Sequence, residues 1–151
     1  MSLTAKSLSD YILKEFEGMN CINTWGETSF FYNSNNKLPR GVYFCTLKEK
    51  DGDNDKDSKI DRAGVYRFNF GLPEKQFVGE FGEKPKRPAK GAVIEGAWDF
   101  TILDRLMPHP IYGWMGWVAI LNPTHESFSE IKPLLKLAYL EAIKGFEKRT
   151  K

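Results

Sequence analysis

His109 is the residue in this sequence whose type best suits proton chemistry, and it lies between Pro108 and Pro110. Proline fixes its own φ and restricts the residue before it, so we expect a rigid, extended backbone at His109. Histidine titrates near neutral pH and can donate or accept a proton there. General acid–base catalysis also requires a group that orients the ring and a substrate pocket, and the sequence indicates neither. We therefore favour a structural, hydrogen-bonded histidine, with a functional role as the alternative.

Aromatic residues follow His109 closely, at Tyr112, Trp114 and Trp117. Such side chains can stack on a nucleic-acid base or another flat ligand. Trp117 begins an apolar run typical of a central strand, and we expect it to enter the core. Trp114 is then the aromatic residue expected to be exposed and available to a ligand.

Arg67 and Asn69 share one face of a predicted strand in VYRFNFG, residues 65–71. Residues two apart in a strand point the same way and lie about 6.5 Å apart. A guanidinium and an amide in this arrangement suit a carboxylate, a phosphate or a base edge. The rival interpretation is a structural salt bridge of Arg67 with one of Asp61, Asp99 and Asp104.

The acidic stretch DGDNDKDSKIDR, residues 51–62, has aspartates at alternate positions, as a calcium-binding EF-hand loop has. Its sixth position is Lys56, where glycine is required, and its twelfth is Arg62, where glutamate is required. We predict a solvated loop and no metal site. The sequence also lacks the phosphate-binding, dinucleotide-binding and GxSxG motifs, so we expect no cofactor and lean towards a protein that is not an enzyme.

Composition limits the remaining classes. The net charge is only +2, from 22 basic and 20 acidic residues, whereas dedicated duplex-binding domains have a clear basic excess. Cys21 and Cys45 are expected to be reduced thiols. No apolar run approaches the roughly 18 residues of a membrane span, so we expect a cytoplasmic protein without a membrane partner. The length suits one domain, residues 1–151.

Periodicity predicts the elements that position these residues. Leu8, Ile12 and Phe16 form an apolar stripe of a first helix, with Ser7 and Asp10 as an approximate capping box. A second long stripe predicts a C-terminal helix that starts near Ser129. Strands are expected in residues 29–33, 41–48, 65–71 and 116–123, one or two helical turns in 73–82, and a strand and loop in 97–110. This order predicts a two-layer α+β domain, with an antiparallel sheet flanked on one face by the N- and C-terminal helices.

Three stretches also resemble an uncharacterised family of small bacterial proteins: DRAGVYRFNFGL (61–72), DRLMPHPIYGWMGWVAILNP (104–123) and IKPLLKLAYLEAI (131–143). Members have a similar Arg-x-Gly-Val-x-Arg-x-Asn stretch, and a similar Pro-His-Pro-x-Tyr-Gly segment before Trp-Val and Asn-Pro. GWVAIL and the following helix more distantly resemble MmcQ/YjbR-like proteins. The resemblance implies an antiparallel sheet with helices on one side. Some YjbR-like proteins have been proposed to bind DNA, and no reaction is implied.

The leading hypothesis is a cytoplasmic, non-enzymatic module that binds a small anionic ligand or nucleic acid. Its predicted binding residues are Arg67, Asn69, His109, Tyr112 and Trp114. One alternative is an enzyme acting on a small acidic metabolite, with His109 as acid or base and Arg67 holding the anion. Another is a protein that binds a protein partner through an exposed sheet edge or aromatic patch. We expect a monomer or a weak homodimer.

Overall fold

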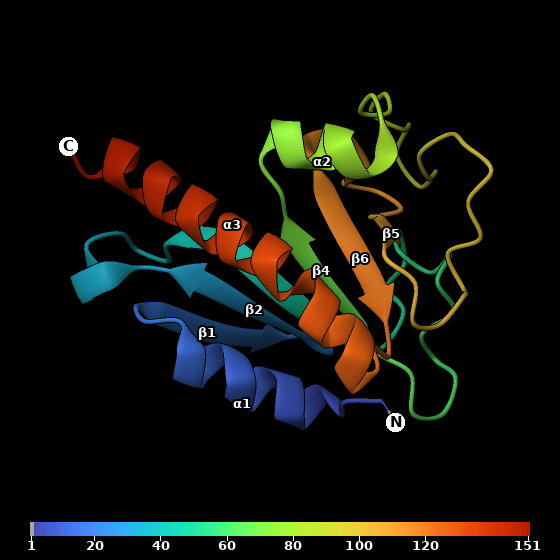
Figure 1. Ribbon diagram of the computed structural model, residues 1–151, viewed down its shortest axis with the longest axis horizontal. Helices are drawn as coiled ribbons and strands as arrows, with labels where there is room; N and C mark the ends of the chain where they lie inside the picture. Colours follow the sequence, from blue (N-terminus) through green and yellow to red (C-terminus); the bar gives the residue numbers. More distant parts are fainter. Residues whose placement is uncertain (1) are drawn as a thin grey trace.

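A six-stranded antiparallel sheet organises the computed structural model, which describes residues 2–151 (Figure 1). The strand order is β1-β2-β3-β4-β6-β5, and every neighbouring pair is antiparallel. The strands are β1 (Met19–Thr24), β2 (Glu27–Tyr32), β3 (Val42–Lys48), β4 (Arg67–Gly71), β5 (Met107–Pro108) and β6 (Trp117–Leu121). The helices are α1 (Ala5–Glu15), α2 (Glu74–Phe81) and α3 (His125–Arg149), with short 3-10 turns at Ser34–Asn36 and Gly113–Met115.

Helices α1 and α3 cover one face of this sheet, and α3 crosses it in Figure 1. The core between the two layers includes Leu8, Ile12, Phe30, Phe44, Phe68, Phe70, Val118, Ile120, Leu135 and Ala138. The predicted alternation in β4 places Phe68 and Phe70 in this core and directs Arg67 and Asn69 to the opposite face. The predicted α+β class, with terminal helices on an antiparallel sheet, is therefore confirmed. No helix within residues 2–151 is long and apolar enough to cross a membrane.

Both predicted helix starts were wrong. Helix α1 is capped by Thr4, whose Oγ1 accepts a hydrogen bond from the Ser7 backbone N–H at 3.0 Å, so Ser7 and Asp10 do not form the cap. Helix α3 begins at His125 rather than near Ser129, because the Thr124 hydroxyl caps it. The cap adds a full turn of helix ahead of Pro133, which then lies inside the helix on its exposed side.

Strand β1 was not predicted, because its sequence MNCINT lacks the alternation of a half-buried strand. It is an edge strand whose last residues are exposed. Residues 97–110 contain only the two-residue β5 and a bridge from Leu103 to Leu121. The proline in β5 explains this shortness, because proline cannot donate to a strand ladder and is confined to sheet edges.

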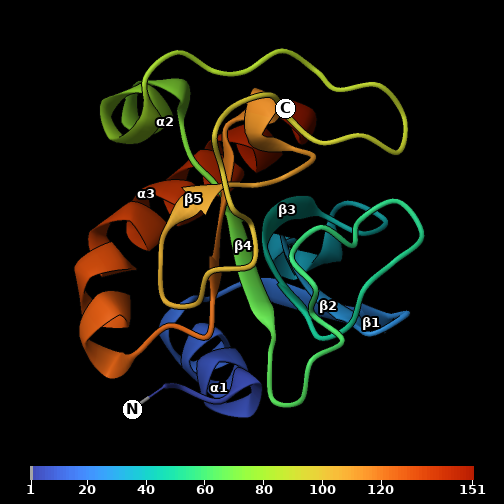
Figure 2. The same ribbon diagram turned by 90° about the vertical axis from the view of Figure 1, so that its right-hand side faces the viewer.

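A second layer covers β4 and β6 on the face opposite the helices. It consists of the loop segments 49–66 and 82–106, and Figure 2 shows the loop that follows β3 on the other side of β4 from α3. Its apolar contacts form a smaller core of Ile60, Ile94, Phe100, Met107, Ala119 and Leu121. The polar side chains of β4, Arg67 and Asn69, are therefore buried beneath loops.

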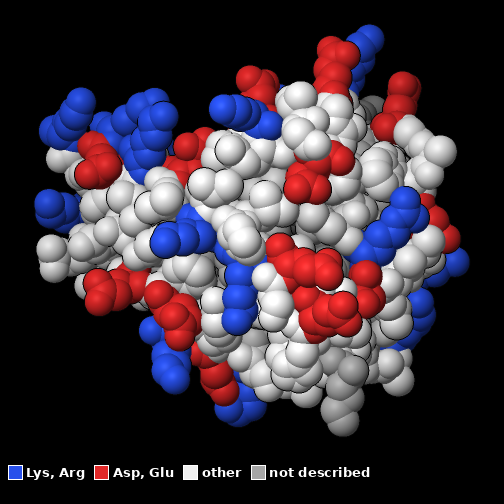
Figure 3. Space-filling model, viewed as in Figure 1, with Lys and Arg blue, Asp and Glu red and all other residues white. Residues whose placement is uncertain are grey.

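Charged side chains of both signs are interspersed over the face that carries α3 (Figure 3). Lysine and arginine gather near the C-terminal end of α3, but acidic residues lie among them. A nucleic-acid surface relies on clustered positive charge. This face therefore offers no extended cationic surface.

Candidate functional site

A cavity of about 720 Å³ opens on the sheet face that α1 and α3 leave free. Strand β3 contributes Tyr43, Thr46 and Lys48 to its lining. The loop segments contribute further walls, which comprise Gly52, Asn54 and Asp55, residues 87–92, and, at the proline-rich corner, His109, Ile111, Tyr112, Trp114, Met115 and Trp117. Its volume is within the range of small-molecule sites.

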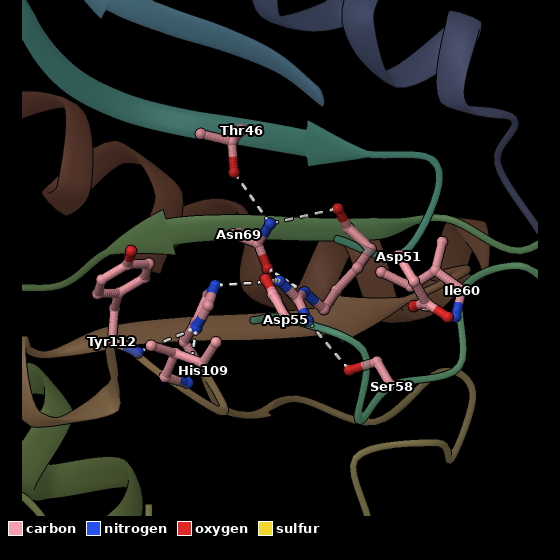
Figure 4. Close-up of polar contacts among 10 residues, drawn as sticks. Thr46, Asp51, Asp55, Ser58, Ile60, Asn69, His109 and Tyr112 are labelled. Carbon is pink, nitrogen blue, oxygen red and sulfur yellow. Dashed lines mark hydrogen bonds and ion pairs between the residues drawn. The ribbon is translucent and has the colours of Figure 1, made fainter. Parts of the chain in front are cut away.

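Arg67 is fully buried and bonds to a network of polar side chains, of which Asp55, Ser58, Asn69 and His109 are labelled in Figure 4. Its Nη1 and Nη2 donate to the two carboxylate oxygens of Asp55 at 2.9 and 2.5 Å. Nη1 also donates to Ser58 Oγ at 3.1 Å, and Nε donates to Asn69 Oδ1 at 2.7 Å. The guanidinium is thus held by a two-pronged ion pair and neighbouring polar groups inside the protein.

The salt-bridge partner of Arg67 is Asp55, so the prediction of Asp61, Asp99 or Asp104 was wrong. Those three carboxylates instead accept hydrogen bonds from Asp51, Thr101 and Thr124, respectively. Asp55 belongs to the loop predicted to be solvated, and the loop folds back over β4. Burial raises the pKa of Asp55, but the hydrogen bonds and charge of Arg67 outweigh it and leave this pKa below its ordinary value.

His109 lies beside Arg67 and is only 3% exposed. Its Nδ1 lies 3.1 Å from the backbone nitrogens of both Ile111 and Tyr112, and its Nε2 lies 3.1 Å from Arg67 Nη2. Burial lowers the pKa of His109 well below its ordinary value, and the positive charge of Arg67 lowers it further. The lowered pKa keeps the ring neutral, with one N–H and one lone pair. Whichever nitrogen carries the lone pair, a protein N–H group lies against it, so this lone pair is not free to take a proton from a ligand.

Asn69 links the network to the cavity through Thr46, its direct partner across β3 and β4. Asn69 Nδ2 donates to Thr46 Oγ1 at 2.9 Å. The Thr46 oxygen is therefore an acceptor in this bond, and its own hydroxyl hydrogen remains available. Since Thr46 lines the cavity, this hydrogen can be donated to a bound ligand.

Lys48 is the main residue that the sequence analysis missed. It is 7% exposed and lines the cavity, yet its side chain makes no ion pair or hydrogen bond with any residue in the described range 2–151. Its Nζ reaches the loop, where a Cβ at Gly52 would lie 3.4 Å away. Lys48 also lies directly opposite Arg67 in the β3–β4 ladder. Like charges directly opposite one another in a ladder are unfavourable, so an anion bound at the Lys48 ammonium would be stabilising.

Aromatic side chains form the other walls. Tyr112 is 49% exposed, and the Arg87 guanidinium lies 4.9 Å from the centre of the half-buried Trp114 ring. Trp117 also lines the cavity and belongs to neither apolar core, so its predicted entry into the core was wrong. Strand β6 buries Val118 and Ile120 under the helices, and alternation directs Trp117 to the other face.

The predicted residues therefore divide into two groups. Arg67, Asn69 and His109 come together, but as a buried network whose polar atoms bond to one another. Tyr112 and Trp114 line the cavity, and so does His109 of the first group. Thr46 and Lys48 were missed, although their alternation with Cys45 and Leu47 in the predicted strand was a signal that they share a face.

The chain belongs to a family of unknown function (DUF6194), whose model matches residues 3–151. No curated protein and no solved structure matches the chain. Membership supports the expected relation to an uncharacterised domain family. The more distant likeness to MmcQ/YjbR-like proteins and the bacterial origin stay predictions.

Proposed function

We propose that this member of the family binds a small anion that carries a flat aromatic group, in the cavity over β3, as a non-enzymatic and cytoplasmic binding protein. The observation that carries the proposal is Lys48, whose largely buried side chain lines the cavity and whose ammonium has no ion-pair or hydrogen-bond partner among the described residues. A carboxylate or phosphate would supply the missing charge.

Thr46 and Lys48 form the anion subsite. They lie two residues apart on one face of β3, about 6.5 Å along the strand, and both line the cavity. Their direct partners in the neighbouring strand β4 are Asn69 and Arg67, respectively. We assign Arg67 and Asn69 to positioning: Arg67 orients the Asn69 amide, and this amide orients the Thr46 hydroxyl towards the ligand.

Tyr112, Trp114 and Trp117 form the subsite for the flat group, together with Tyr43. Rings of this kind bury large apolar area and stack on planar ligands. Arg87 lies against Trp114 at the edge of the cavity and adds positive charge there. An anion with an aromatic group therefore meets charge on β3 and stacking surfaces at the proline-rich corner.

The alternative function is acid–base catalysis by His109. The position of His109, beside Arg67 and in the lining of the cavity, favours this alternative. Protein N–H groups face both of its ring nitrogens, however, and a general base requires a free lone pair within reach of the substrate. Binding without a reaction is therefore the function better supported by this geometry.

Titration with 3-phenylpropionate and with phenyl phosphate tests the proposal, followed by the fluorescence of the tryptophans in the cavity and by calorimetry. We expect binding of at least one probe, and a loss of affinity of roughly ten-fold or more in Lys48→Met, because a hydrogen bond to a charged group contributes about 1.5–3 kcal/mol. Lys50→Met is the matched control, since Lys50 is exposed and outside the lining of the cavity. Equal affinity in wild type and Lys48→Met, or no binding of either probe, would overturn the proposal.

A further inference from the structure

We infer that the ligand is zwitterionic, with an ammonium group beside its carboxylate, as in an aromatic amino acid, and that Glu27 receives the ammonium. This inference rests on the proposed function and names its ligand class. It arises from two residues of opposite charge that are partners in the sheet and line the cavity but form no ion pair with each other.

Glu27 and Lys48 are direct partners in the antiparallel pair of β2 and β3. The Cβ atoms of such partners lie about 4.5–5.5 Å apart, and opposite charges in this position normally attract. Both residues line the cavity. The ion pairs within residues 2–151 are nevertheless Lys6–Asp10, Arg67–Asp55 and Lys84–Glu74.

Lys48 extends away from Glu27 towards the loop at Gly52, close to Asp55 and His109. Asp55 cannot neutralise it fully, because both carboxylate oxygens of Asp55 bind Arg67. On strands β2 and β3 the cavity thus has one cation, Lys48, and one anion, Glu27, that form no ion pair among the described residues, while Arg87 and Lys90 add positive charge on its loop wall.

A ligand with only a carboxylate would satisfy Lys48 but bring negative charge next to Glu27. A ligand with only an ammonium would satisfy Glu27 and be repelled by Lys48. An amino acid carries both groups on neighbouring atoms, so it can meet both side chains at once. Its aromatic side chain would then pack against Tyr112 and Trp114, which line the same cavity.

Three probes that share a phenyl ring and differ in charge test the inference by calorimetry: L-phenylalanine, 3-phenylpropionate without the amino group, and 2-phenylethylamine without the carboxylate. We expect L-phenylalanine to bind about five-fold more tightly than 3-phenylpropionate, since Glu27 is half-exposed and pairs of this kind contribute up to about 1 kcal/mol. 2-Phenylethylamine should bind most weakly.

Glu27→Gln should reduce the ratio of the two affinities to about one, because the amide carries no charge to attract the ammonium. Glu49→Gln is the matched control: Glu49 is exposed and outside the lining of the cavity, so the five-fold ratio should persist. If 3-phenylpropionate binds through Lys48 but L-phenylalanine binds no more tightly, or if the ratio survives in Glu27→Gln, the zwitterion inference fails and the proposed function stands. If neither compound shows affinity that depends on Lys48, the proposed function itself fails.

Discussion

At the scale of single residues, the buried pair of Arg67 and Asp55 carries the largest energetic consequence. Taking two charges out of water is costly, and their attraction offsets this only with good geometry and further hydrogen bonds. Here the geometry is two-pronged, and Ser58 and Asn69 occupy further N–H groups of Arg67. Removal of one member would leave an uncompensated buried charge.

We therefore expect Asp55→Asn to lower the free energy of unfolding by about 3–5 kcal/mol, measured by urea denaturation. Asp53→Asn is the control, because Asp53 lies exposed in the same loop. A stability of Asp55→Asn equal to that of the control would show that the pair does not hold the loop over β4.

His109 predicts a pH dependence. Its folded pKa is lowered from the ordinary 6.5 by burial and by Arg67 and Lys48, against the opposing effect of Asp55. As the pH falls, His109 therefore binds a proton in the unfolded chain at a higher pH than in the folded protein. The contribution of His109 to the free energy of unfolding is fully present above pH 6.5. Below this pH the contribution is lost, by up to about 1.4 kcal/mol per pH unit.

This loss should disappear in His109→Asn, when unfolding free energies are compared at pH values one unit above and below 6.5. Asp55 does not contribute in that window, because its pKa is lowered from 3.8 and it titrates only at more acidic pH. An unchanged slope in the variant would assign the pH dependence to other groups.

At the scale of elements, α3 shows how packing overrides a local conflict. Pro133 has no N–H for the carbonyl of Ser129 and is disfavoured in a helix interior. The helix continues because buried residues on both sides of the proline, including Phe128, Ile131 and Leu135, pack against the sheet. The predicted later start assumed that the proline would decide the boundary, whereas the Thr124 cap and this packing do.

Replacement of the proline tests this balance. We expect Pro133→Ala to raise the free energy of unfolding by about 2 kcal/mol, since the intrinsic cost of proline in a helix is about 3 kcal/mol and the freer unfolded chain returns part of it. Lys136→Ala, at another exposed position of α3, should change stability by less than about 0.5 kcal/mol. A destabilised Pro133→Ala in thermal unfolding followed by circular dichroism would contradict the argument.

At the scale of the whole molecule, the sheet lies between two unequal layers. The helical layer packs on a large apolar core, whereas the loop layer has a small one and is attached to β4 by the network of Arg67. Segments with few buried contacts and little regular backbone hydrogen bonding open at lower free energy. The site depends on this weaker layer, because the loop around Asp55 forms a wall of the cavity.

Hydrogen exchange followed by mass spectrometry should therefore show faster exchange in segments 49–66 and 82–106 than in β3, β4 and β6. A bound aromatic carboxylate should slow exchange in 49–62, because it would bridge Lys48 and the loop wall. Uniform exchange across both layers would mean that the protein opens only as one unit.

Local patterns in the sequence were sufficient to predict that the two terminal helices and most strands exist. They also predicted the α+β class and the face shared by Arg67 and Asn69. These features follow from side-chain periodicity, which is a property of neighbouring residues. Only the tertiary structure decided that Asp55 pairs with Arg67, that Thr46 and Lys48 lie beside the network, and that Glu27 is the ladder partner of Lys48 without an ion pair to it. The physical reason is that strand order and the return of an irregular loop bring together residues far apart in the chain, and no repeat in the sequence encodes such contacts.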